Sequence, residues 1–313
     1  MNCKTIDVKW HSTPFPHAII DNFLDQDEFN SLTKELDGQN TTILRDYITS
    51  AERKTIYNDH KMGEHALALI RTMGGDIVKK AIQNELNCDI TSLGETFDYS
   101  GYSPYHITRD LGYLGSHVDH SSVRSEKLRH VANSIFYASS SWEEDWGGET
   151  IFFSKNGLRP VKKIKPIPNR LVLFLHSANS FHGVEVFNSN GVQERRTFYH
   201  DYYVNEANIN TAMDFLNQRH NLKLKHAYHS TTFVPYFPFG LLDLDRLNHL
   251  IMKGNLDYAM KYAVYQLNKA LSNKQDNHRS SISQSTQKKI KLTIDGLDAF
   301  GIRKKLRRFR KSS

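Results

Sequence analysis

The stretch between residues 91 and 205 constrains the fold most, because short segments rich in Tyr, Phe, Ile, Val and Thr alternate there with Gly, Pro, Asn or Ser. These segments occupy 96–107, 130–138, 149–153, 171–176, 183–187 and 195–204. Strands of this length and spacing are typical of a β-sandwich or barrel, whereas βαβ units would place helical segments between the strands. Gly147-Gly148 and the stretch 166–169 supply turn signals. The pattern therefore predicts a mainly β core.

Helical periodicity flanks this core on both sides. A short strand within 14–24 precedes helices expected at 25–36, 64–73 and 76–86, and further helices are expected at 243–252 and 257–271. We therefore expect an N-terminal strand with supporting helices in 1–90, the β core in 91–205, a C-terminal helical extension in 206–271, and a polar linker with a basic tail in 272–313. The expected fold class is mainly β with flanking helices (α+β).

The positive charge of the chain is concentrated in its tail. Residues 272–313 contain twelve Lys/Arg and three Asp, a surplus of nine, so a net charge of +7 leaves about −2 (7 minus 9) for the other 271 residues. Leu306 and Phe309 lie among seven basic residues between Arg303 and Lys311. Such a tail fits an anionic membrane surface, nucleic acid, or a flexible solubilising role. It does not indicate what the core binds.

Two features bear on the cellular compartment. The chain has only two cysteines, Cys3 and Cys88, which excludes a disulfide framework and fits a reducing environment. No apolar run approaches the roughly 18 residues that a membrane span needs, and the N-terminus lacks the apolar stretch of a signal peptide. We expect a cytoplasmic protein with no membrane span.

A candidate metal site begins with the motif GSHVDH at 115–120. Residues two apart on a strand point to the same face, so His117 and Asp119 can reach one ion from one side. A lone His-x-Asp is weak evidence, because chance alone is expected to produce such pairs. The segment SFHGVEV at 180–186 offers a third ligand, His182, 63 residues after Asp119. Two histidines and one carboxylate on one face of a metal are the ligands of non-heme Fe(II) oxygenases, which keep three sites open.

A basic residue follows thirteen positions later, in RRTFY at 195–199. Arg195 and Thr197 share one face of the expected strand with Tyr199. The planar guanidinium fork suits a carboxylate better than an ammonium group does. Arg195 is therefore the residue expected to bind a dicarboxylic cosubstrate.

From residue 96 to 204 the sequence resembles the prolyl-4-hydroxylase-like branch of the 2-oxoglutarate/Fe(II) dioxygenases. The matching stretches are GYLGSHVD at 112–119, NSIFY at 133–137, WGGET at 146–150, PNRLVLF at 168–174, HGVEV at 182–186 and RRT at 195–197. The N-terminal PFPHAIIDNFL at 14–24 also resembles the first segment of that family. The resemblance covers roughly 110 residues continuously, and its order and spacing are more specific than any one motif.

This resemblance implies a double-stranded β-helix core of the jelly-roll, cupin-like type. It also implies that His117, Asp119 and His182 are the iron ligands. Arg195 matches the residue that pairs with the distal carboxylate of 2-oxoglutarate, and the Thr197 hydroxyl is expected to assist it. The implied cofactors are Fe(II), 2-oxoglutarate and O2, with ascorbate as a candidate reductant.

Two further residues, Tyr137 and Asn133, lie on the strand that usually lines the cosubstrate pocket in this family. We expect them to contribute to that pocket. The alternative for Tyr137 is an ordinary aromatic side chain of the β core.

Alternative assignments exist for three positions. His176 is a second candidate for the third ligand, but it adjoins the apolar run 171–175, where a histidine is more often structural. His120 adjoins Asp119 and is expected on the opposite strand face, exposed or in contact with substrate. Arg196 is a second candidate for the cosubstrate arginine, although alternation with Thr197 favours Arg195.

The expected activity is hydroxylation of an unactivated C–H bond with release of succinate and CO2. Halogenases of this superfamily lack the carboxylate ligand, so Asp119 favours hydroxylation. The family branch suggests a peptidyl proline as substrate, and a small metabolite is equally compatible. The segments 121–129 and 141–146 are candidates for the entrance of the site, or else solvated loops. The alternative from another class is a non-catalytic jelly-roll protein, such as a sugar-binding or scaffold cupin.

Overall fold

The computed structural model describes residues 8–38, 43–48, 52–57, 62–92, 104–123, 127–226 and 231–233. The helices expected at 243–252 and 257–271, and the linker and tail at 272–313, lie outside the described residues. So does most of the strand expected at 96–107. The domain boundaries drawn from the sequence stay predictions.

The described elements are as follows. The N-terminal part contains β1 (Trp10–His11), β2 (His17–Ile20), α1 (Gln26–Gly38), β3 (Ile43–Ile48), β4 (Glu52–Tyr57), α2 (Glu64–Met73), α3 (Asp76–Leu86) and β5 (Thr91–Ser92). The central part contains β6 (Tyr105–Thr108), β7 (Gly112–Val118), β8 (Ser122–Val123), β9 (Leu128–Tyr137), η3 (Glu144–Trp146), β10 (Thr150–Phe153), β11 (Pro160–Ile164), β12 (Leu171–Leu175), β13 (His182–Phe187) and β14 (Arg195–Asn205). It is followed by η4 (Glu206–Asn208), α4 (Ile209–His220) and β15 (Thr232–Phe233).

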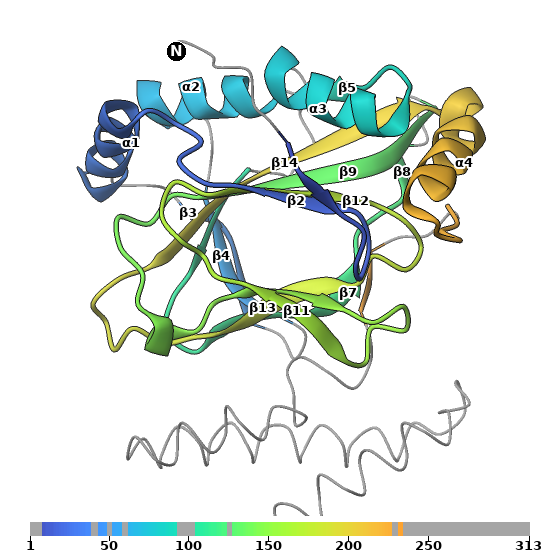
Figure 1. The fold of residues 1–313 in the computed structure, drawn as a ribbon. Helices are drawn as coiled ribbons and strands as arrows, with labels where there is room; N and C mark the ends of the chain where they lie inside the picture. The colour runs from blue at the N-terminus through green and yellow to red at the C-terminus, as the bar shows by residue number, and fades with distance from the viewer. Residues whose placement is uncertain are drawn as a thin grey trace, which may run out of the picture. The chain divides into compact units, whose positions relative to one another are not determined.

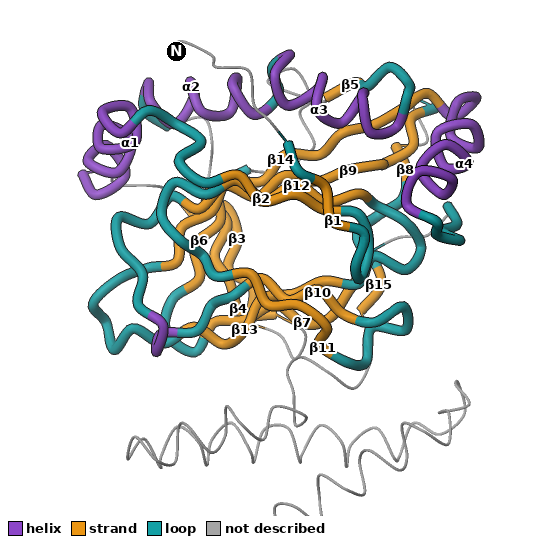
Figure 2. Tube along the Cα trace, viewed as in Figure 1, coloured by secondary structure: helices purple, strands orange, loops and turns teal. Residues whose placement is uncertain are grey.

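The strands pair in the order β1-β2-β12-β9-β14-β6-β4-β7-β13-β10-β11, with β3, β5, β8 and β15 attached to β4, β14, β9 and β7. The central pairings β12 with β9, β14 with β9 and β13 with β7 are antiparallel. Figure 1 shows two facing layers, one with β2, β12, β9 and β14 and the other with β7, β13 and β11. Figure 2 shows β3, β4 and β6 between the layers on one side. This architecture is a jelly roll, which confirms the expected fold class.

Strand β12 illustrates why the layer that contains β2, β12, β9 and β14, called the upper layer below, is hydrophobic on both faces. Leu171, Leu173 and Leu175 belong to the cluster that also contains the helix side chains. Val172 and Phe174 belong to a second cluster with residues of the opposite layer. Because side chains alternate between the two faces of a strand, covering both faces requires a continuous apolar run. The sequence LVLFL at 171–175 meets that requirement.

Helices α1, α2 and α3 lie over the outer face of the upper layer (Figure 1). Each presents an apolar stripe at helical spacing, formed by Phe29, Leu32 and Leu36 in α1, by Ala66, Leu69, Ile70 and Met73 in α2, and by Val78, Ile82 and Leu86 in α3. These side chains pack with the outward residues of β9, β12 and β14 in a single cluster. Among the residues that the structure describes, none of the helices has the length and apolarity that a membrane crossing needs.

Three strand regions of the structure lie outside the segments that the apolar pattern of the sequence predicted as strands. Strand β7 contains two glycines and a serine, and β11 contains two lysines, so neither shows the apolar pattern by which strands are recognised in sequence. Strand β4 is equally polar, and its partner β3 was not expected either. Their pairing partners hold these segments in the sheet. The helix break at Gly74-Gly75 lies where the sequence predicts it.

Two buried histidines outside the metal motif are held in their neutral form. His17 donates Nδ1–H to the Phe15 carbonyl at 2.8 Å, and its Nε2 has no hydrogen-bond partner among the described residues. Nε2 of His200 likewise has none within that part of the chain. Burial lowers the pKa of each imidazole from 6.5 to about 4, because burial disfavours the charged form.

These two histidines should make the protein sensitive to acid. The unfolded chain binds a proton at each site below about pH 6.5, whereas the folded protein does so only near pH 4. The free energy of unfolding should therefore decrease as the pH is lowered from about 6.5 to about 4. We expect His200→Gln to reduce the change of the free energy of unfolding with pH in this window by up to about 1.4 kcal/mol per pH unit. Denaturant unfolding at a series of pH values between 7 and 4 measures this dependence. Equal slopes in both proteins would contradict the assignment.

Candidate metal centre

The structure brings His117, Asp119 and His182 together from two strands. His117 lies on β7, Asp119 follows its last residue, and His182 begins β13. One ligand atom from each lies within 4.8 Å of the others. The Nε2 atoms of His117 and His182 are each 3.2 Å from an oxygen of Asp119, Oδ1 and Oδ2 respectively. The antiparallel register places His182 directly opposite His117.

Backbone carbonyls fix the orientation of both imidazoles. Nδ1 of His117 lies 2.8 Å from the Gly115 carbonyl oxygen, and Nδ1 of His182 lies 3.0 Å from that of Ser180. A carbonyl oxygen only accepts, so both Nδ1 atoms carry the proton. Each Nε2 then turns a lone pair towards the Asp119 carboxylate. A metal ion between these atoms satisfies all three, and such a hydrogen bond from the second nitrogen is usual for a metal-bound histidine.

Burial and neighbouring charges shift the pKa values of His117 and Asp119. Burial, reinforced by His182, lowers the pKa of His117, so that its ring is neutral. Burial alone raises the pKa of Asp119, but the two neighbouring histidines outweigh it and hold this pKa well below its usual value. Neutral imidazoles and an ionised carboxylate are the forms that bind a divalent cation.

The pairing of β7 with β13 depends on a close approach at Gly183. A Cβ atom there would lie 2.5 Å from the carbonyl oxygen of Leu114 and 3.0 Å from that of Gly115. Any larger residue at 183 would push the two strands apart. Since these strands carry His117 and His182, Gly183 helps to set the distance between the two histidines.

A buried arginine lies on the inner face of β14. Arg195 is 2% exposed, and its Nε donates to the Gly148 carbonyl at 2.7 Å while Nη2 donates to the Thr150 hydroxyl at 3.2 Å. The guanidinium also lies over the ring of Tyr137, 5.3 Å from its centroid. Among the described residues, Arg195 has no ion pair with a carboxylate. A buried cation without an acidic partner is suited to binding an anion.

Three residues around this guanidinium have defined contacts. The Tyr137 hydroxyl lies 2.6 Å from that of Thr150, and Thr197 donates its hydroxyl to the His106 carbonyl at 3.3 Å. A Cβ atom on Gly148 would lie 3.0 Å from Cδ of Arg195, and its φ of +77° favours glycine. Thr150 and Gly148 carry no site signal of their own in the sequence, although both belong to the matched stretch WGGET.

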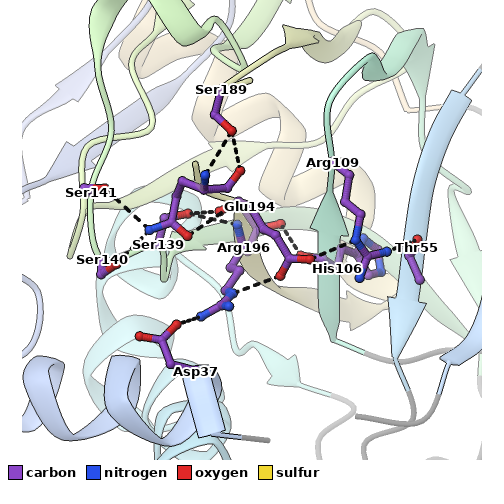
Figure 3. A network of polar contacts seen from close by, with 12 residues as sticks. Asp37, Thr55, His106, Arg109, Ser139, Ser140, Ser141, Ser189, Glu194 and Arg196 are labelled. Carbon is purple, nitrogen blue, oxygen red and sulfur yellow. Dashed lines mark hydrogen bonds and ion pairs between the residues drawn. The ribbon is translucent and has the colours of Figure 1, made fainter. Parts of the chain in front are cut away.

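Arg196 points away from Arg195, as alternation on a strand requires. It lies in the polar network of Figure 3, where it bonds Asp37 of α1 at 2.5 Å and Glu194 at 3.3 Å. Arg109 joins the same network through Glu194 at 2.8 Å. Arg196 therefore has acidic partners, and of the two neighbouring arginines only Arg195 shares the buried cluster with Tyr137 and Thr150.

The two alternative histidines lie next to the three candidate ligands. His176 does not belong to that group, and its Nε2 lies 3.1 Å from the backbone oxygen of Asp119. His120 is half-buried, and its Nε2 lies 2.9 Å from the Tyr203 hydroxyl. Both side chains lie near the segment that carries Asp119, but neither joins the group of His117, Asp119 and His182.

Asn133 has a more specific place than the cosubstrate pocket expected for it. Its amide nitrogen donates to Asp119 Oδ2 at 3.1 Å and to Asp201 Oδ1 at 3.0 Å. Asp201 is directly opposite Asn133 in the pairing of β14 with β9. Sequence reasoning missed Asp201, although it shares the strand face of Arg195 and Thr197 at even spacing. The role of Asn133 in cosubstrate binding stays a prediction.

The two candidate entrance segments are partly described. Segment 121–129 contains the short strand β8, with 124–126 outside the described residues. In segment 141–146, Trp142 donates its indole N–H to the Gly147 carbonyl at 2.8 Å. Their place at the entrance stays a prediction.

Comparison with known families gives one match. Residues 102–203 match the family model described as the 2OG-Fe(II) oxygenase superfamily. The matched segment contains His117, Asp119, His182 and Arg195. The sequence has no significant match among curated proteins.

Several solved structures are similar to the chain. A prolyl-4-hydroxylase from Pseudomonas putida has 16% identity and a TM-score of 0.41, covering 60% of this chain and 90% of its own. A viral collagen prolyl hydroxylase from Paramecium bursaria Chlorella virus-1 has 15% identity, a TM-score of 0.39, and coverage of 60% and 96%. HygX from Streptomyces hygroscopicus, crystallised with nickel, 2-oxoglutarate and hygromycin B, has 14% identity, a TM-score of 0.40, and coverage of 59% and 82%. At these values the similarities carry no argument about reaction or substrate.

The close approach at Gly183 leads to a prediction about metal affinity. Gly183→Ala should move β7 away from β13 and weaken metal binding by roughly 10- to 100-fold, the effect usual for residues that orient metal ligands. Titration with Fe(II) or Co(II) under anaerobic conditions measures the dissociation constant. Gly38→Ala is the matched control, because a Cβ atom at 38 meets nothing within 4 Å. Equal metal affinity of the Gly183 variant and the wild type would refute the role given to this glycine.

Proposed function

Because residues 102–203 belong to the 2OG-Fe(II) oxygenase superfamily, we propose that this enzyme hydroxylates an unactivated C–H bond, with His117, Asp119 and His182 as its iron ligands. The cosubstrate is 2-oxoglutarate, and succinate and CO2 are the coproducts. The observation that carries the proposal is the convergence of two imidazole Nε2 atoms and one carboxylate within 4.8 Å. Bound iron and 2-oxoglutarate together supply the activation of dioxygen, which no side chain can provide.

The residues of the chain hold the metal and keep its surroundings dry. The carbonyls of Gly115 and Ser180 keep both Nε2 atoms turned towards Asp119. On one side, the ring centroids of Phe174 and His182 are 4.7 Å apart, and those of Phe152 and Phe174 are 5.3 Å apart. These buried aromatic rings exclude water from that flank, which strengthens the electrostatic interactions within the site.

Arg195 is the proposed partner of the distal carboxylate of 2-oxoglutarate. Gly148 and Thr150 accept hydrogen bonds from two of its nitrogens and hold the guanidinium plane in place. Burial raises the pKa of Tyr137, so its phenol stays protonated and can donate to an anion. We include Tyr137 and Thr197 in this proposed pocket.

Two substrate classes remain within the proposal, a peptidyl proline and a small metabolite. The sequence resemblance to the prolyl-4-hydroxylase-like branch supports the former. A non-catalytic jelly-roll protein is the contrasting proposal, and it gives the unpaired buried Arg195 no role.

The iron-ligand assignment predicts loss of turnover when a ligand is removed. We expect His182→Ala to lower succinate release from 2-oxoglutarate by roughly a hundredfold or more, because a lost ligand costs more than a lost supporting contact. Anaerobic loading with Fe(II), exposure to air and quantification of succinate give the rate. His11→Ala, which removes an exposed imidazole from β1, is the control. Full turnover by the His182 variant would disprove the assignment, and absence of iron binding by the wild type would favour a non-catalytic protein.

The role of Arg195 predicts a selective effect on the cosubstrate. Arg195→Lys should raise the KM for 2-oxoglutarate by roughly 10- to 100-fold, because the ammonium group cannot form the same paired hydrogen bonds. The Fe(II) dissociation constant should change little. Arg196→Lys is the matched control, since that arginine points to Asp37 and Glu194. A similar KM in the two variants would show that Arg195 does not bind the cosubstrate.

A further inference from the structure

Asp201 is a carboxylate beside the candidate metal centre that the proposed reaction does not use. It lies on the same face of β14 as Arg195, six residues further along the strand. Its Oδ1 accepts from the amide of Asn133 at 3.0 Å, and that amide also donates to Asp119 Oδ2 at 3.1 Å. Asp201 is therefore one hydrogen-bonded residue away from a proposed metal ligand.

No Lys or Arg of the described residues forms an ion pair with Asp201. The nearest basic nitrogen is Nε2 of His130, at 3.7 Å from Oδ1. Burial lowers the pKa of His130, and both of its ring nitrogens face backbone carbonyl oxygens. The Tyr203 hydroxyl lies 3.4 Å from Oδ2, at the long end of the hydrogen-bond range. Among the described residues, the carboxylate of Asp201 thus lacks a lysine or arginine partner.

Charge balance makes this carboxylate stand out once the centre is loaded. The double positive charge of Fe(II) and the charge of Arg195 together cancel Asp119 and dianionic 2-oxoglutarate. Asp201 would then be a carboxylate beside the metal that no lysine or arginine of the described residues balances. A buried or half-buried carboxylate in that position is costly unless a cation joins it.

Asn133 adds a second acceptor without a donor. The residue is 5% exposed, and its Oδ1 has no hydrogen-bond partner among the described residues. The amide orientation is fixed by its surroundings, because a flipped amide would point its oxygen at two carboxylates. Since Asn133 and Asp201 face each other across β9 and β14, the Asn133 oxygen and the Asp201 carboxylate lie on neighbouring side chains.

The exposed side of the centre is the side of the two aspartates. The side chains of Asp119 and Asp201 are 21% and 14% exposed, whereas those of His117 and His182 are 5% and 6% exposed. Phe174 and Phe152 close the flank next to His182. Asp201 therefore belongs to the more exposed part of the candidate centre.

A second metal ion is a less suitable occupant. His120, His130 and Asp201 are close enough together to hold one. However, the ring nitrogens of His130 face the carbonyl oxygens of His120 and Ala132, at 2.8 and 3.0 Å. They do not face a common centre with Asp201. An ammonium or guanidinium group instead supplies both the missing charge and the missing N–H donors.

We propose that Asp201, together with Oδ1 of Asn133, binds an ammonium or guanidinium group of the substrate, so that this oxygenase acts on a cationic compound. The inference rests on the proposed function, because it takes the neighbouring site to be the iron centre. It narrows both substrate classes, to a free amine or to a peptide with a basic side chain next to the oxidised position.

The experiment compares matched ligands that differ in charge. The full-length enzyme is loaded anaerobically with Fe(II) and 2-oxoglutarate, and binding is followed by the change in the visible absorption of the iron–cosubstrate complex. One pair is pentylamine and 1-pentanol. The other is a blocked tripeptide with a central lysine and the same peptide with norleucine. Preference within the first pair indicates a free amine as substrate, and preference within the second indicates a peptide.

We expect the cationic member of at least one pair to bind roughly 10- to 100-fold more tightly than its neutral partner, as hydrogen bonds to a charged group predict. Asp201→Asn keeps an oxygen for the Asn133 amide but removes the charge, and should abolish the preference. A purely structural role of Asp201 would change both affinities together and leave their ratio unaltered. Asp214→Asn, on the exposed side of α4, is the control and should keep the wild-type ratio.

The proposal is wrong if the wild type shows no preference in either pair, including the case in which no probe binds. It is also wrong if the preference survives in the Asp201 variant. Failure of the wild type to bind Fe(II) and 2-oxoglutarate at all is a separate result, which would overturn the proposed function and the cation site with it.

Discussion

The alternation of side chains along β9, β12 and β14 is the constraint on which the rest of the structure depends. Along β12, and along β9 and β14 away from the irregularity at Tyr202–Tyr203, alternate residues pack in the cluster with the helices while those between them face the opposite layer. A shift of one residue in register would exchange the two sets, moving apolar anchors inward and polar site residues into the helix interface. The hydrophobic packing of the outer face therefore also fixes which polar groups lie inside the jelly roll.

The register of both layers places the inner residues in rows. In the upper layer, Asn133 is opposite both Phe174 and Asp201. In the lower layer, His182 is opposite both His117 and Phe152. Each row thus runs from polar groups at one end to an aromatic ring at the other, and Phe174 meets His182 between the layers. This arrangement gives the metal centre one dry flank and one polar flank.

Backbone carbonyl groups orient several side chains of the candidate site. The carbonyls of Gly115 and Ser180 select the tautomer of each candidate ligand histidine, and the Gly148 carbonyl holds the Arg195 guanidinium. Because these carbonyls belong to strands or to the turns next to them, the side chains that they hold move little relative to the sheets. Preorganised groups of this kind lose little entropy when a ligand binds.

The charges of the site form a short sequence along the inner face of β14. Arg195 begins this strand, Asp201 lies six residues further along it, and the amide of Asn133 connects Asp201 to the candidate ligand Asp119. In the proposed function, a dicarboxylic cosubstrate binds at Arg195 and a cationic group of the substrate binds at Asp201. One strand would then hold cosubstrate and substrate at separate positions, because its alternate residues project to the same interior.

The sequence by itself predicted the fold class, the three helices before the core, and the candidate site residues His117, Asp119, His182 and Arg195 from their spacing. Apolar periodicity and motif spacing are local properties, so they can be read without coordinates. Strand β7 was expected only through its metal motif, and β11 was not expected at all, because its lysines are compatible with a strand only when neighbouring strands pair with it. Only the tertiary structure placed Asp201 next to Asn133, set the Gly183 contact and turned Arg196 away from Arg195, because these contacts join residues far apart in the chain, and strand pairing alone decides which of them meet.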